Sequence, residues 1–141
     1  MGVAAVLVWL LALSVFDLRE RRLPNWLTLP GAAVIPAVAA LHGRGPAALA
    51  GAGALFAVYL VVHLVAPASL GAGDVKLAPG IGALTGAFGA DAWLVAALGT
   101  ALLSAVWAVA LLVRRSDSVV PHGVSMCIGA AAVYLLHTVS R

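Results

Sequence analysis

The chain has 141 residues, of which 64% are hydrophobic and 9% charged, and its formal net charge at pH 7 is +3. Soluble domains carry about 25% charged residues, so this composition excludes an ordinary soluble protein and indicates a single-domain integral membrane protein. The basic residues form short clusters at the ends of apolar segments, which is typical of membrane topology signals and not of a nucleic-acid-binding surface. The single cysteine, Cys127, excludes an internal disulfide and a Cys-x-x-Cys zinc site.

Apolar segments separated by prolines, glycines and charged turns predict an all-α fold of six transmembrane helices in one domain, residues 1–141. The expected helices are about 1–22, 26–41, 46–66, 74–88, 91–113 and 124–139. The apolar part of the first helix, at ~1.5 Å per residue, falls short of a ~30 Å hydrocarbon core, so this helix is expected to continue into a basic turn before Pro24. Asn25 is expected to cap the second helix. Gly82 and Gly86 form a small-xxx-small face for close helix packing.

The basic residues predict the orientation of these helices. With short loops, successive helix ends alternate between the two sides of the membrane. Six basic residues then fall on one side and two on the other; the six are Arg19, Arg21, Arg22, Lys76, Arg114 and Arg115, and the two are Arg44 and Arg141. This bias predicts a multi-pass protein of the cytoplasmic (inner) membrane with both termini outside the cytoplasm. Asp17 and Asp74 are thereby placed at one depth, near the cytoplasmic face.

The segment Gly71-Ala72-Gly73-Asp74-Val75-Lys76 carries an acidic residue into otherwise apolar surroundings. An ionisable group at membrane depth is energetically expensive, so Asp74 is a functional candidate. Gly71 and Gly73 can adopt positive φ and, lacking a Cβ, can let another backbone approach. Lys76 is expected either to favour ionisation of Asp74 or to contact lipid phosphate.

Asp17 and Asp74 together suggest a hydrolytic chemistry. Two carboxyl groups in a partly dry site tend to share one proton and to titrate as a pair. One of them can then activate a water while the other donates a hydrogen bond to a scissile carbonyl. This chemistry needs no metal and no cofactor, and the chain has no His-Glu-x-x-His or Gly-x-Ser-x-Gly motif.

Three segments carry a family resemblance. Gly71-Ala72-Gly73-Asp74 resembles the GxGD motif of polytopic aspartyl peptidases, and its extension to Lys76 resembles the bacterial type IV prepilin peptidases. The segment from Asp17 through Pro24 and Asn25 is similar to the D-x(6)-P-N-x-L-T pattern around that family's first catalytic aspartate. Pro121-His122-Gly123 is similar to the stretch before the family's last helix, although His122 replaces the aromatic residue usual there.

The resemblance implies an aspartic endopeptidase that removes the cytoplasmic leader of type IV pilin-like precursors, with Asp17 and Asp74 as the catalytic pair. It also implies a pilin-like precursor and the lipid bilayer as partners, and no nucleic acid. The supporting residues would be those of the three motifs: Gly71, Gly73, Lys76, Pro24, Asn25, Pro121 and Gly123. Longer family members carry a cysteine-rich region associated with N-methylation, which this chain lacks, so peptidase activity without methyltransferase activity is expected, as in compact enzymes of tight-adherence pilus systems.

Two other functions fit the same acidic pair. In a small proton- or cation-coupled transporter, Asp17 and Asp74 would form a cation site. In a non-catalytic assembly protein, they would only fix helix packing. His63 is expected to be a hydrogen-bonded packing residue and not a proton relay.

Overall fold

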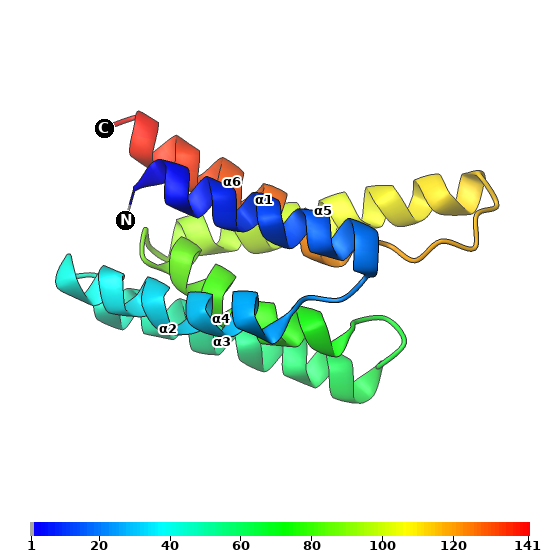
Figure 1. The fold of residues 1–141 in the computed structure, drawn as a ribbon, viewed down its shortest axis with the longest axis horizontal. Helices are drawn as coiled ribbons and strands as arrows, with labels where there is room; N and C mark the ends of the chain where they lie inside the picture. The colour runs from blue at the N-terminus through cyan, green and yellow to red at the C-terminus, as the bar shows by residue number, and fades with distance from the viewer. Residues whose placement is uncertain (1) are drawn as a thin grey trace.

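The computed structural model describes residues 2–141, and within that range the chain forms six α-helices and no strand (Figure 1). They are α1 (Val3–Glu20), α2 (Asn25–Leu41), α3 (Gly45–Val65), α4 (Ala72–Gly86), α5 (Ala90–Val113) and α6 (His122–Val139). The expected start of the first helix at residue 1 lies outside the described residues. Every other helix end falls within two residues of its expected position. The all-α prediction is therefore confirmed.

Local chemistry explains the sharp connection between α1 and α2. Arg21 adopts a left-handed conformation (φ 50°) that ends α1, and Pro24, in an extended conformation, occupies the cap position of α2. The expectation that Asn25 caps α2 is wrong, because Asn25 is the first helical residue and no side chain caps this helix. Proline fits the cap position since its fixed φ suits extended backbone and it has no N–H to satisfy.

Successive helices run in opposite directions (Figure 1). Both chain termini and the C-terminal end of α2 therefore lie at one end of the bundle. The α1–α2, α3–α4 and α5–α6 connections lie at the other end. Three helices in the described range are long and apolar enough to cross a membrane, namely α3, α5 and α6. In contrast, α4 has only 15 residues, or about 22 Å at 1.5 Å per residue. The structure is therefore that of a membrane protein. Of the six expected spans, these three helices have the length and composition to cross a membrane.

Close contact between α3 and α4 depends on three glycines. A Cβ added to Gly51 would collide with the carbonyl oxygen of Gly82 and would lie 2.8 Å from Cα of Gly86. The expected small-xxx-small packing of Gly82 and Gly86 is therefore present, with Gly51 as its partner. Such close backbone approach lets short α4 be buried among the other helices, and ten of its residues are buried.

Trp9 fixes α1 against α2 and α4. Its indole N–H donates to the carbonyl of Leu27 at 2.9 Å. Its ring fills the space left by two glycines, because a Cβ on Gly31 would overlap the ring and one on Gly80 would lie 3.2 Å from it. This contact sets the position of α1 two turns before Asp17.

Candidate active site

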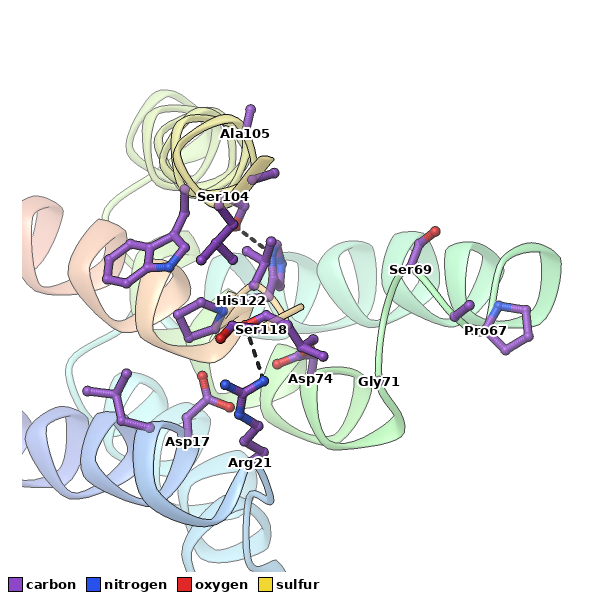
Figure 2. Close-up of a pocket in the computed structure, with 18 residues that line it drawn as sticks. Asp17, Arg21, Pro67, Ser69, Gly71, Asp74, Ser104, Ala105, Ser118 and His122 are labelled. Carbon is purple, nitrogen blue, oxygen red and sulfur yellow. Dashed lines mark hydrogen bonds between the residues drawn. The ribbon is translucent and has the colours of Figure 1, made fainter. Parts of the chain in front are cut away.

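Asp17, in the last turns of α1, and Asp74, in the first turn of α4, line one cavity of about 800 Å³ (Figure 2). The C-terminal half of α5, the segment 67–71 and the segment 118–122 supply its other walls. Both aspartates are partly buried, and the charge of Asp17 acts on Asp74. They also line a second pocket of about 290 Å³, together with Lys76. The structure thus brings together two carboxylates that the sequence separates widely.

The start of α6 holds the carboxylate of Asp17. The backbone N–H of Val124 donates to its Oδ2 at 3.0 Å. A Cβ on Gly123 would lie 2.9 Å from the carboxylate carbon, so only glycine leaves room for this approach. Unpaired N–H groups at a helix N-terminus attract anions, which explains why the carboxylate lies there. Gly123, expected to be a supporting residue, contacts the acid itself.

The glycines before Asp74 give space and not an unusual backbone conformation. Gly71 caps α4 in an extended conformation (φ −73°), and Gly73 lies within the helix. Positive φ among glycines of the described range occurs only at Gly43 and Gly89, so Gly71 and Gly73 do not use the positive φ that glycine allows. A Cβ on Gly73 would lie 3.4 Å from the Cβ of Leu23, and one on Gly71 would lie 3.9 Å from Oδ2 of Asp74.

Lys76 links two of the sequence motifs. Its ammonium group donates to the side-chain oxygen of Asn25 at 3.1 Å, so the amide of Asn25 serves this contact and not a helix cap. Lys76 is exposed and lines the smaller pocket, together with Asp17 and Asp74. Pro24 and Pro121 are the cap residues of α2 and α6, respectively. The expected supporting residues therefore position the helix ends around the cavity.

His122 joins three helices at the cavity wall and was not among the expected site residues. Its Nε2 is 2.8 Å from the hydroxyl of Tyr59 in α3. Its Nδ1 is 2.7 Å from the hydroxyl of Ser104 in α5 (Figure 2). Its place between Pro121 and Gly123 was the one available signal. Nothing in the sequence around Tyr59 or Ser104 marks either as a site residue. His63 instead bonds the carbonyl of Leu70 at 2.7 Å, as expected of a packing residue.

Arg21 is a second residue that sequence reasoning did not place in the site. It lines the cavity, and its guanidinium donates to the carbonyl of Val119 at 3.4 Å (Figure 2). Its positive charge acts on Asp17. Because Val119 lies in the segment between α5 and α6, this contact ties that segment to the end of α1.

The arrangement suits acid–base chemistry by two neighbouring carboxyl groups. Within residues 2–141, no group of three His, Cys, Asp or Glu side chains is placed to hold a metal ion. The reactive groups facing the cavity are the carboxyls of Asp17 and Asp74, with the imidazole of His122 and the hydroxyl of Ser104 on its wall. Two carboxyl groups that share a proton can supply a base and an acid at once.

Comparison with known proteins agrees with this chemistry. The chain matches the model of the type IV leader peptidase family over residues 4–114, which include both aspartates and end before α6. No match is found among curated proteins or among solved structures. The family match favours a peptidase over the transporter and assembly-protein alternatives. Because it covers most of the chain, the protein belongs to the type IV leader peptidase family.

Proposed function

We propose that this protein is an aspartic endopeptidase that removes the cytoplasmic leader from type IV pilin-like precursors, with Asp17 and Asp74 as its catalytic pair. The observation that carries this proposal is the shared cavity, because two aspartates from separate motifs and separate helices line it. Membership of the leader peptidase family supports the reaction class. Among such precursors, we propose those of tight-adherence pili as the substrates.

In the proposed mechanism, the two carboxyl groups hold one proton between them. The ionised member removes a proton from a water molecule, which attacks the scissile carbonyl, while the protonated member donates a hydrogen bond to that carbonyl oxygen. The tetrahedral intermediate then collapses as a proton passes to the leaving amine. Oδ2 of Asp17 accepts the N–H of Val124, and this bond fixes the orientation of the carboxylate at the cavity.

Placement of the cavity suits a leader held in the cytoplasm. We infer six membrane spans with both termini outside the cytoplasm, so that the end of the bundle carrying the aspartates faces the cytoplasm of the inner membrane. Four of the eight Lys and Arg residues lie in the α1–α2 and α5–α6 connections. Arg19, in the last turn of α1, and Lys76, near the start of α4, lie at the same end. The positive-inside bias supports this orientation.

The test uses the purified full chain in lipid vesicles with a pilin-like precursor that carries its leader. Intact mass spectrometry of the product should show loss of the leader at a single bond before the hydrophobic segment. Cleavage elsewhere, or none while the protein remains folded, would contradict the proposed function. An added methyl group on the product would contradict the narrower expectation of peptidase activity alone.

A further inference from the structure

A separate cavity, distinct from the two pockets beside the aspartates, lies at the opposite end of the bundle, where α2, α4 and α6 end. Its volume is about 260 Å³, and four basic side chains line it: His42, Arg44, His137 and Arg141. No acidic side chain is among the described residues that line it. This cavity takes no part in the proposed hydrolysis.

The cavity is lined by the two arginines that lie at the end of the bundle with few basic residues. Of the eight Lys and Arg residues, only Arg44 and Arg141 fall at this end, and both line the same pocket. Topology signals need only act near helix ends and have no reason to converge. Convergence of the two cations with two histidines in one cavity is what an anion-binding site requires.

Phe88 contacts two of the basic residues, Arg44 and His137. The guanidinium carbon of Arg44 lies 5.4 Å from the centre of the Phe88 ring, and the His137 ring stacks on the same residue with centroids 5.1 Å apart and an angle of 33°. A cation above an aromatic ring is attracted to the face of the ring, and a guanidinium carries five N–H donors with which it can bind an anion. Arg44 is therefore held beside the cavity by its contact with Phe88.

The two histidines are oriented by their own helices. Nδ1 of His42 lies 2.9 Å from the carbonyl of Val38, and Nδ1 of His137 lies 2.9 Å from the carbonyl of Val133. Because a carbonyl only accepts, Nδ1 carries the hydrogen in each ring. Nε2 is then the nitrogen that each ring presents away from its helix, and it becomes a donor when the ring is protonated.

Apolar side chains complete the cavity. Ile35, Leu84 and Ala87 line it beside the cations, so the pocket offers a charged rim and a hydrocarbon wall at the level where helices end. A free inorganic anion has no use for the hydrocarbon wall, whereas a phospholipid uses both features. Basic pockets between transmembrane helices are suited to anionic headgroups.

We propose that this cavity binds the phosphate group of an anionic phospholipid, such as phosphatidylglycerol, in the leaflet opposite the aspartates. Arg44 and Arg141 supply the permanent charge, Arg44 supplies the main donors, and His42 and His137 add donors when protonated. The bound lipid joins the ends of α2, α4 and α6. This site is independent of the peptidase proposal, since none of its residues lines the cavity of Asp17 and Asp74.

The test measures lipid affinity of the purified full chain in a neutral detergent, with the thermal unfolding midpoint as a second readout. Phosphatidylglycerol should bind more tightly than phosphatidylcholine and should raise the midpoint. Arg44→Gln should weaken phosphatidylglycerol binding about fivefold, as expected for the loss of one cation near a charged headgroup, and Arg44→Lys should retain most of the affinity. Arg115→Gln, an exposed arginine at the other end, is the matched control and should bind like the parent.

Inorganic phosphate in place of the lipid separates the two sources of the anion. Protection by phosphatidylglycerol but not by phosphate would support a lipid headgroup as the ligand, and equal protection by inorganic phosphate would overturn this assignment. Equal binding of the two lipids by the parent, or an unchanged preference in Arg44→Gln, would overturn the proposal. Precursor cleavage by Arg44→Gln in neutral detergent should match the parent, so failure of the lipid site and failure of the peptidase are distinguishable.

Discussion

The backbone N–H of Val124 donates a 3.0 Å hydrogen bond to Oδ2 of Asp17, which lies 107 residues earlier in the chain. This contact makes the start of α6 part of the candidate active site, although the family match ends at residue 114. The position of one of the two proposed catalytic carboxylates thus depends on a helix that carries neither aspartate.

Replacing Gly123 with alanine should reduce cleavage strongly with little loss of stability. The new methyl group would lie 2.9 Å from the carboxylate carbon of Asp17 and would push it away from Val124. Displacement of a catalytic group by about 1 Å can cost on the order of 10²-fold in rate. The measurement is kcat/KM for the precursor beside the thermal midpoint.

The matched control for this variant is Gly99→Ala. No heavy atom lies within 4 Å of the Cβ position at Gly99, so this change should leave the rate unaltered and the helix slightly more stable. Full activity of Gly123→Ala would show that the carboxylate does not depend on the α6 N-terminus.

The hydrogen bond between Tyr59 and His122 should contribute measurably to the packing of α3 against α6. We expect the double-mutant cycle of Tyr59→Phe and His122→Phe to give a coupling free energy of about 0.5–1.5 kcal/mol, the range found for hydrogen bonds between transmembrane helices. Reversible unfolding in detergent provides the four stabilities. Tyr59→Phe combined with His137→Phe, at the far end of the bundle, should be additive. Zero coupling between Tyr59 and His122 would mean that this hydrogen bond does not stabilise the packing of α3 against α6.

Gly51→Val should destabilise the protein by about 2 kcal/mol or more, because its side chain would enter the contact of α3 with Gly82 and Gly86. Gly53→Val is an almost ideal control, since it lies two residues along the same helix with open space at its Cβ position. The difference in the free energy of unfolding between the two variants measures the packing effect alone. Similar stabilities would contradict the close approach of α3 and α4.

Cleavage should depend on pH with a maximum between two limits. At low pH both Asp17 and Asp74 are protonated and no base remains, so the rate falls; at high pH both are ionised and no acid remains, so it falls again. The measurement is kcat/KM against pH, with the thermal midpoint at each pH as the control for unfolding. A rate that rises with pH to a plateau would be inconsistent with a shared proton.

The helices and the acidic pair could be predicted because their signals are local. Apolar runs bounded by Pro24, Pro67 and the glycines fix the helix ends within two residues, and each aspartate lies in its own short motif. Tyr59 and Ser104 could not be predicted, since they enter the site only through the packing of α3 and α5 around His122.

Tertiary contacts decided the role of Asn25, where the local expectation failed, and of the glycines before Asp74. The amide of Asn25 bonds Lys76 in place of capping α2. Gly71 and Gly73 keep ordinary backbone angles, and Gly73 provides the room in which Leu23 packs against α4. In both cases the residue type marked a position of structural importance, and a contact with a neighbouring helix or loop determined what the residue does there.

The most direct measurement of the central proposal is precursor cleavage by Asp17→Asn and Asp74→Asn in lipid vesicles, with Asp91→Asn as the control. Asp91 lies at the start of α5, outside both pockets that contain the candidate pair. We expect each of the first two variants to fold like the parent and to lose on the order of 10³-fold or more in kcat/KM, while Asp91→Asn cleaves normally. Cleavage at the parental rate by a folded Asp17→Asn or Asp74→Asn variant would contradict the proposal.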